Sequence, residues 1–317
     1  MRKPVMKLVT LAVVSAVLLA ACSSGASSDK ASGSGAGSKG GSANVSIGLA
    51  LSTLNNPFFV SLREGAQAAA DAAGVKLIVT DARDDATQQA NQIQNFQTQQ
   101  LAGVIINPVD SDAAGPIVAP LIQAKTPVVA VDRAVNGAQV NSFVASDNVA
   151  GGKLAAQALA KAIGEKGKVV VLQGVAGTSA SRDRGQGFTE GIKAYPNITV
   201  VATQPADFDR VKGLDVATNL LQAQPDAVGI FAENDEMALG AIQALGDRAG
   251  KKIFVVGFDG TADGVSAIKA GTMTASIAQQ PKQLGKSAVE AVLGLLKGKA
   301  VQKTLAVPVV VVTKDNA

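Results

Sequence analysis

From residue 44 onward, short apolar runs alternate with longer stretches in which apolar residues recur at helical spacing. This alternation constrains the fold most, because strands that are apolar throughout must be covered on both faces, as in parallel sheets flanked by helices. The predicted strands cover residues 45–51, 76–80, 103–107, 127–131, 142–145, 168–172, 198–202, 227–231, 252–258, 274–278 and 305–312. The predicted helices include residues 59–73, 87–100, 150–162, 183–194, 212–223, 236–245 and 281–296. The pattern predicts a three-layer α/β protein with mostly parallel sheets.

The length of this pattern predicts two lobes, because roughly 270 residues are more than one compact core usually holds. In open parallel sheets, ligands bind beyond the carboxyl ends of the strands. Those ends are rich in amide, carboxylate and guanidinium groups here, at residues 54–59, 107–108, 132–133, 146–148, 233–235, 259–260 and 279–280. A single Asp or Asn at such an end is as readily explained by helix capping or a turn. The whole set indicates a polar binding site.

Aromatic residues sharpen this interpretation because they are rare: the chain has nine Phe, one Tyr and no Trp. Phe58 and Phe59 nevertheless stand together in the first strand-end loop, and Phe208 lies between two aspartates. Phe59 could still begin the buried face of the following helix. Aromatic rings combined with Asn, Asp, Arg and Gln suit a small polyol, whose hydroxyls donate to carboxylates and accept from guanidinium groups.

The composition excludes several classes of function. The chain has no histidine and one cysteine, which disfavours transition-metal chemistry and excludes histidine-based triads, so we expect a non-enzyme with no cofactor and no metal. The net charge is +4, of which Arg2, Lys3 and Lys7 supply three charges, and the nearly neutral remainder argues against nucleic-acid binding. The glycine pattern GQGFTEG at 185–191 has the wrong spacing for a dinucleotide site and does not directly follow a predicted strand.

Residues 1–22 have the layout of a secretory signal, with basic residues, an apolar run and small residues before Cys22. The run is too short to span a bilayer core of ~30 Å comfortably. It resembles a bacterial lipoprotein leader, and this resemblance implies that Cys22 is acylated and becomes the first residue of the mature protein. Residues 23–43 are dominated by Ser and Gly and are predicted to form a flexible tether. We therefore expect a protein exported and lipid-anchored outside the cytoplasmic membrane.

A family resemblance extends over nearly all of residues 44–317. Its strings are STLNNPFFVSL at 52–62, NP at 107–108, DSD at 110–112, ASDN at 145–148, LQG at 172–174, AGTSA at 176–180, QPADFD at 204–209, NDEMALG at 234–240 and VGFDGT at 256–261. With them the chain resembles the ribose-binding branch of the type I periplasmic binding protein family, which serves bacterial sugar ABC importers. The lac-repressor family shares this fold, but its members carry DNA-binding helices where this chain has the export signal.

The resemblance implies an N-terminal lobe of residues 44–146 plus 280–307 and a C-terminal lobe of residues 147–279 plus 308–317. The cleft between these lobes closes by hinge motion. The phenylalanines that sandwich the sugar in this family fall here on Phe58, Phe59 and Phe208. The residues that bind its hydroxyls fall on Asn56, Asp132, Arg133, Arg184, Asn234, Asp259 and Gln279.

The same resemblance implies D-ribose as the ligand and a monomeric protein that delivers it to ABC permease subunits in the membrane. A chemoreceptor is a further candidate partner. Another pentose, a hexose such as allose, or a furanose-like signal molecule stays open as the ligand.

Overall fold

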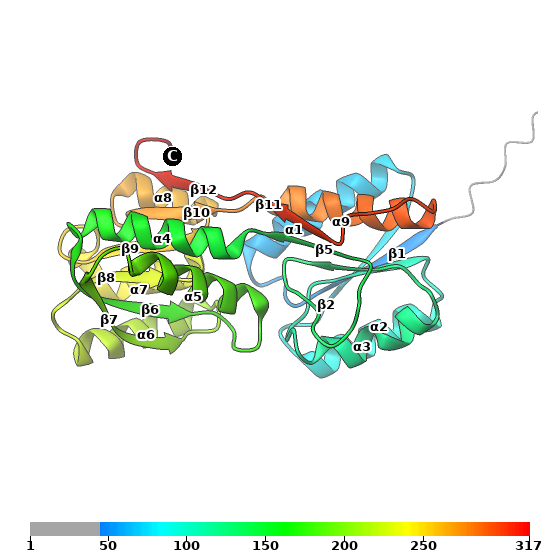
Figure 1. Ribbon diagram of the computed structural model, residues 1–317, viewed down its shortest axis with the longest axis horizontal. Helices are drawn as coiled ribbons and strands as arrows, with labels where there is room; N and C mark the ends of the chain where they lie inside the picture. The colour runs from blue at the N-terminus through cyan, green and yellow to red at the C-terminus, as the bar shows by residue number, and fades with distance from the viewer. Residues whose placement is uncertain (1–44) are drawn as a thin grey trace, which may run out of the picture. The chain divides into compact units, whose positions relative to one another are not determined.

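The computed structural model describes residues 45–317 (Figure 1). These residues form two six-stranded sheets. The strands of the first sheet are β1 (Ser46–Leu51), β2 (Lys76–Asp81), β3 (Gly103–Ile106), β4 (Val128–Val131), β5 (Ser142–Ser146) and β11 (Thr304–Val307). Those of the second sheet are β6 (Lys166–Gln173), β7 (Asn197–Pro205), β8 (Ala227–Ala232), β9 (Phe254–Asp259), β10 (Ala275–Ala278) and β12 (Val310–Thr313). The predicted leader with Cys22 and the predicted tether lie outside the described residues.

The spatial order of the strands is β11-β5-β4-β3-β1-β2 in the first sheet and β12-β10-β9-β8-β6-β7 in the second. The strands pair in parallel, apart from the antiparallel pair of β10 and β12. The carboxyl ends of the parallel strands therefore gather at one edge of each sheet. Loops at these two edges carry the polar side chains described below.

Helices cover both faces of each sheet. On the first sheet, α1 (Pro57–Ala72) and α9 (Pro281–Leu296) pack on one face, and α2 (Ala86–Thr98) and α3 (Ala114–Gln123) pack on the other. On the second sheet, one face is covered by α4 (Asn148–Ala162) and α5 (Ser179–Ile192), and the other by α6 (Arg210–Ala223), α7 (Asp235–Leu245) and α8 (Ala262–Ala270). A short 3₁₀-helix, η1 (Gly246–Arg248), follows α7. The predicted α/β class is confirmed.

The alternation of side chains along β6 shows why these strands are apolar throughout. Val169 and Val171 face the helices α4 and α5, whereas Val170 and Leu172 face α6 and α7. Both faces of this stretch of β6 are therefore buried, which explains why residues 169–172 are all apolar.

Two details differ from the sequence-based prediction. The strand predicted at 305–312 is in fact two strands, β11 and β12, which lie in different sheets on either side of Pro308. Proline has no N–H for a sheet ladder, and the chain crosses between the sheets there. The helices α3 and α8 were not predicted; α3 contains Pro120, and α8 has nine residues and ends at Gly271, whose φ is 77°. Prolines, glycines and short length weaken the helical pattern in both segments.

The chain passes between the two sheets after β5, after β10 and after β11 (Figure 1). Each sheet with its helices is called a lobe below: the N-terminal lobe contains β1, and the C-terminal lobe contains β6. Within residues 45–317, no helix combines the length and the apolar character needed to cross a membrane.

Candidate binding site

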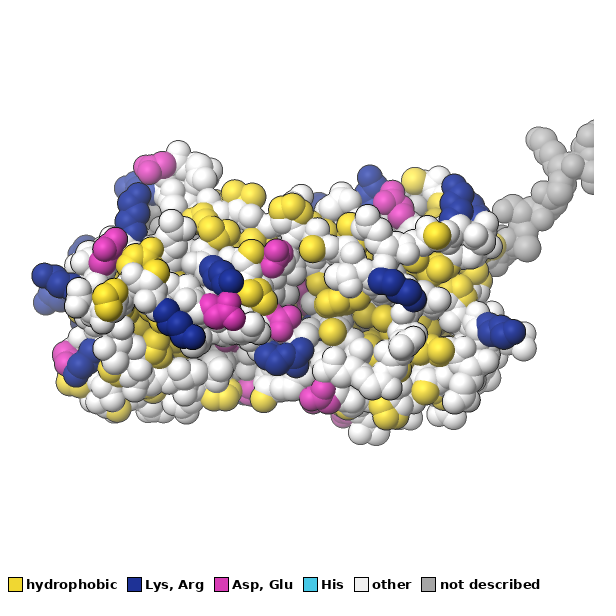
Figure 2. All heavy atoms as spheres, in the orientation of Figure 1, with side chains coloured by type: hydrophobic (Ala, Val, Ile, Leu, Met, Phe, Trp, Pro, Cys, Tyr) yellow, Lys and Arg dark blue, Asp and Glu magenta, His cyan; other side chains and the backbone are white. Residues whose placement is uncertain are grey.

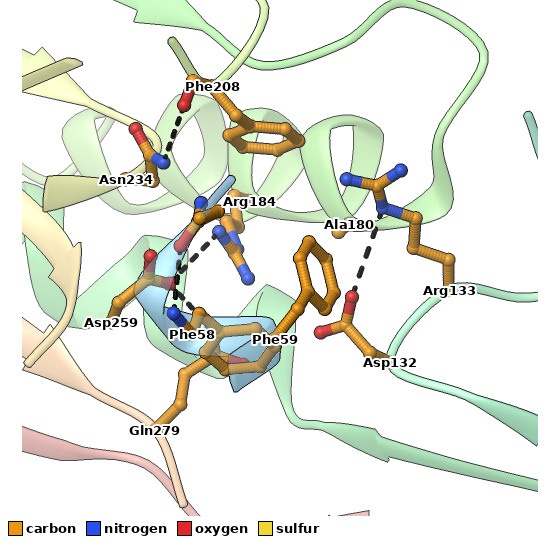
Figure 3. A pocket seen from close by; sticks show the side chains of 11 residues that line it. Phe58, Phe59, Asp132, Arg133, Ala180, Arg184, Phe208, Asn234, Asp259 and Gln279 are labelled. Atoms are coloured by element: carbon orange, nitrogen blue, oxygen red, sulfur yellow. Dashed lines mark hydrogen bonds and ion pairs between the residues drawn. The ribbon is translucent and has the colours of Figure 1, made fainter. Parts of the chain in front are cut away.

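A cavity lies between the carboxyl ends of the two sheets (Figure 3). The space between the lining side chains, open solvent included, is about 240 Å³. The lining residues are Asn56, Phe58, Phe59, Asp132, Arg133, Ala180, Arg184, Phe208, Asn234, Asp259 and Gln279. The structure thus brings all ten sequence-predicted site residues to one cavity, although their contact with a ligand stays a prediction. Ala180 was not predicted, because a small apolar side chain carries no chemical signal in the sequence.

The start of α1 supplies the aromatic wall of the N-terminal lobe. Asn56 caps this helix, and its Oδ1 accepts a hydrogen bond from the backbone N–H of Phe58 at 2.9 Å. The rings of Phe58 and Phe59 meet edge to face with centroids 5.1 Å apart. Both side chains belong to the core of this lobe and also line the cavity, so Phe59 does begin a buried helix face, while its contact with a sugar stays a prediction.

Asp132 and Arg133 follow β4 and are both buried. Asp132 has a φ of 63°, and its Oδ2 accepts a hydrogen bond from Asn107 Nδ2 at 3.1 Å. Arg133 Nη1 donates to the carbonyl oxygen of Pro108 at 3.0 Å. The Arg133 guanidinium lies 5.3 Å from the ring centroid of Phe59. Asn107 orients Asp132 from behind the cavity; its strand-end position was noted in the sequence, but its role was missed.

Arg184, on α5, is held from several sides within the C-terminal lobe. Its Nε donates to Asn148 Oδ1 at 2.9 Å, and its Nη1 donates to the carbonyl oxygen of Glu233 at 2.7 Å. Nη1 also lies 3.6 Å from Asp259 Oδ1. The guanidinium stands 4.0 Å from the ring centroid of Phe258. Little freedom remains for this side chain, so it presents its donors to the cavity in a fixed orientation.

Phe208 covers the cavity from the C-terminal lobe (Figure 3). Its φ is 59°, and its carbonyl oxygen accepts a hydrogen bond from Asn234 Nδ2 at 3.1 Å. Asn234 Oδ1 caps α7 by accepting from the N–H of Met237 at 2.9 Å. A Cβ at Gly174 would lie 2.0 Å from the Phe208 ring. The ring therefore packs directly on glycine backbone, a close approach that any side chain at 174 would block.

Burial dominates the electrostatics of the site. It raises the pKa of Asp132, which the neighbouring Arg133 and Arg184 partly oppose. It also raises the pKa of Asp259 well above its ordinary value, against the attraction of Arg184. Burial lowers the pKa of Arg133, which Asp132 and Asp84 oppose. Two acids and two bases thus offset one another's desolvation inside the cavity.

Three buried polar atoms of the lining have no hydrogen-bond partner within residues 45–317. They are Asp132 Oδ1, Arg133 Nε and Gln279 Oε1. The Arg133 Nε is 3.9 Å from Asp132 Oδ2, too far for a hydrogen bond. Buried polar groups are normally paired, so two acceptors and one donor here fit a small ligand with several hydroxyl groups. Within the described residues, no group of three His, Cys, Asp or Glu side chains is arranged to hold a metal ion.

The two lobes also contact each other directly beside the cavity. Ala134 N–H, from the N-terminal lobe, donates to Ser179 Oγ at 2.8 Å. Ser179 N–H donates to Ser111 Oγ at 3.1 Å, and Ser111 N–H donates to the carbonyl oxygen of Gly177 at 3.1 Å. These hydrogen bonds are formed only when the lobes are together, so the structure is a closed arrangement of the two lobes.

The fold and the cavity define a two-lobed solute-binding protein. A family described as the periplasmic binding protein domain matches residues 47–300, and the chain belongs to this family. The chain is 48% identical to the ribose import binding protein of Salmonella typhimurium over 273 residues, which is 86% of this chain and 92% of that protein. It is 46% identical to the ribose import binding protein of Bacillus subtilis over 263 residues, 83% of this chain and 85% of that protein.

A solved structure shows the same fold. The solute-binding protein of an ABC transporter from Actinobacillus succinogenes, with bound D-allose, superposes with a TM-score of 0.80 at 33% sequence identity. The match covers 85% of this chain and 98% of that chain.

Proposed function

We propose that this chain binds D-ribose outside the cytoplasmic membrane and delivers it to the permease of an ABC importer, without catalysing a reaction. The cavity carries the proposal: Asp132 and Arg133 of one lobe face Arg184 and Asp259 of the other around aromatic rings. The relatives named for ribose import, at 46–48% identity, support ribose as the ligand.

Closure of the two lobes is the mechanism in this proposal. Residues 44–146 with 280–307, and residues 147–279 with 308–317, move as the two bodies. A ligand favours the closed form only through contacts that it gains there, and the charged lining supplies such contacts from both sides. The permease then binds the closed form, and a chemoreceptor is a second candidate partner for this form.

A calorimetric titration of the purified protein with a panel of pentoses and hexoses tests the ligand. A site that hydrogen-bonds each hydroxyl rejects an analogue lacking one, so ribose is expected to bind at least about tenfold more tightly than 2-deoxyribose. Equal affinities for these two sugars would contradict the proposal.

A second candidate ligand is D-allose or another relative of ribose, including a furanose-like signal molecule. The D-allose complex of a protein that is 33% identical favours this alternative. Preference for a hexose over ribose in the same titration would select it.

The location of the protein is also part of the proposal. Acylation of Cys22 anchors the exported chain to the membrane, and residues 23–43 tether a monomeric binding domain near its importer. The proposal includes no nucleic-acid partner; on the face shown in Figure 2, Lys and Arg side chains are interspersed with Asp and Glu. The proposal includes no cofactor and no metal.

A further inference from the structure

The turn that carries Asp259 has a strained backbone. Asp259 has a φ of 116°, which residues with a side chain rarely adopt, and Gly260 follows with a φ of 70°. Such a conformation persists only where the surrounding structure holds it. The Asp259 carboxylate accepts a hydrogen bond from Gln279 Nε2 at 2.7 Å and lies in the cavity beside Arg184 (Figure 3). The geometry of the turn therefore decides where this carboxylate points.

Asp235 lies behind this turn, is fully buried and does not line the cavity. Its Oδ2 accepts hydrogen bonds from Thr261 N at 2.7 Å and from Thr261 Oγ1 at 2.9 Å. Its Oδ1 accepts from Ser276 Oγ at 2.6 Å, and Ser276 Oγ in turn accepts from Gly260 N at 3.0 Å. The two residues after Asp259 are thus both hydrogen-bonded to the Asp235 carboxylate, Thr261 directly and Gly260 through the Ser276 hydroxyl.

The packing around Asp235 leaves it no alternative position. A Cβ at Gly257 would lie 2.3 Å from Asp235 Oδ1, and a Cβ at Gly264 would lie 2.3 Å from Oδ2. Strand β9 and helix α8 therefore approach the carboxylate so closely that only glycine fits at these two positions. The side chain is enclosed by β9, α8 and β10 at once.

We propose that Asp235 is a positioning residue for sugar binding: it holds the turn at residues 259–261 in the conformation that aims the Asp259 carboxylate into the cavity. This inference rests on the proposed function and deepens it, because it adds a residue that sets affinity without touching the ligand.

Asp235 also acts on Asp259 through its charge. Burial raises the pKa of Asp235 to about 6, against the hydrogen bonds from Ser276 and Thr261. The groups that face Asp259 are Arg184, which lowers its pKa, and Asp235 and Asp132, which raise it. Removal of the Asp235 charge is therefore expected to lower the pKa of Asp259.

Titration with ribose near neutral pH tests the positioning. Asp235→Asn keeps the size of the side chain but points an amide N–H₂ at donors, so we expect binding about tenfold weaker or more. Ser276→Ala removes the bridge to Gly260 and is expected to weaken binding about threefold or more. Asp263→Asn is the matched control: its exposed carboxylate lies on α8, just after the same turn, and pairs with Arg210 at 2.8 Å, so affinity should be unchanged.

A double-mutant cycle separates positioning from general damage to the fold. In an Asp259→Asn background, Asp235→Asn should add less than about twofold, because both changes act through one carboxylate. Independent losses, or wild-type affinity in Asp235→Asn, would overturn the inference. If Asp235→Asn does not fold, the cycle is measured with Ser276→Ala and Asp259→Asn instead. Losses of affinity that are independent in this second cycle would also overturn the inference.

A sugar-free readout distinguishes this inference from the proposed function. The carboxyl carbon of Asp259 is titrated by NMR in the wild type and in Asp235→Asn, or in Ser276→Ala if only that variant folds. A lower Asp259 pKa in Asp235→Asn, or a displaced Asp259 resonance in Ser276→Ala, supports the coupling of the two carboxylates; an unchanged signal contradicts it. A wild-type protein that binds no sugar of the panel would overturn the proposed function, and the role of Asp235 in sugar binding with it, whatever the NMR result.

Discussion

Glu233 offers a direct test of how burial acts on this site, because it is a buried carboxyl that does not line the cavity. Its Oε2 accepts hydrogen bonds from Gly174 N at 2.7 Å and from Ser181 Oγ. Its Oε1 is buried without a hydrogen-bond partner among the described residues. The change Glu233→Gln keeps one acceptor for the two donors and replaces the unpartnered oxygen with an amide group.

The expected effect follows from the pKa. Burial raises the pKa of Glu233 from an ordinary 4.5 to about 7, against the hydrogen bonds from Gly174 and Ser181 and the attraction of Arg184. Because each pKa unit between the unfolded and folded states is worth ~1.4 kcal/mol, ionisation of Glu233 lowers the free energy of unfolding by about 3 kcal/mol. This stability is fully present below the unfolded pKa and is lost as the pH rises through the folded pKa. Glutamine does not titrate, so the variant avoids the loss.

Urea unfolding of the sugar-free protein between about pH 4.5 and 8.5 measures this effect. We expect Glu233→Gln to match the wild type at the acid end and to exceed its free energy of unfolding by about 3 kcal/mol at the alkaline end. The other buried carboxyls titrate in both proteins and cancel in the difference. Glu290→Gln, which changes an exposed carboxyl on α9, is the control and should show no trend with pH. A difference between wild type and Glu233→Gln that is constant across this range would refute the reasoning.

Three further predictions concern binding and location. Arg133→Ala or Arg184→Ala should weaken ribose binding about tenfold or more, because each leaves a buried carboxylate unpaired; a variant folded by circular dichroism that titrates like the wild type would contradict that arginine's role. Ser179→Ala removes the acceptor for Ala134 N–H across the lobes and should weaken the same binding about fivefold, whereas unchanged affinity would show that this contact does not favour closure. Cys22→Ser should abolish incorporation of a radioactive fatty acid and membrane retention on fractionation, and label retained on the variant would disprove the lipid anchor.

The fold class could be predicted because its cause is local. Buried parallel strands must be apolar on both faces, and the sequence shows this requirement as nearly continuous apolar runs such as 168–172. The apolar pattern alone joined residues 305–312 into one strand, because both halves are apolar and only Pro308 marks the crossing, whereas the lobe bounds implied by the family resemblance divide them between 307 and 308. Helix α3 was missed because its prolines and glycine weaken the periodic signal, while packing on β4 and against α2 stabilises it.

Most of the predicted cavity residues lie at strand ends or in family strings, whereas Arg184, inside α5, was assigned by the family resemblance alone. The residues behind them were harder to assign. Asn107, Glu233 and Asp235 appear in the sequence as polar strand ends, but they do not line the cavity, and their side chains hydrogen-bond to segments that are distant in the chain. Asp132 and Phe208 adopt positive φ values, which could not be predicted from the sequence because neither residue is glycine. Such features are properties of tertiary packing rather than of local pattern.

The three consecutive residues that follow β8 have different roles on the C-terminal side of the cavity. Asn234 lines the cavity and caps α7. Glu233 accepts hydrogen bonds from Gly174 and Ser181, and Asp235 accepts hydrogen bonds from the turn that carries Asp259. The two carboxylates differ in how well they are satisfied: Asp235 has donors on both oxygens, whereas Glu233 has donors on only one. Burial raises the pKa of both carboxyls, so the contrast lies in their partners: an amide at 235 turns an N–H₂ toward a hydrogen-bond donor, whereas an amide at 233 can place it at the oxygen that has no partner. Similar amide substitutions are therefore expected to act on different properties: Asp235→Asn weakens sugar binding, and Glu233→Gln raises the free energy of unfolding above neutral pH.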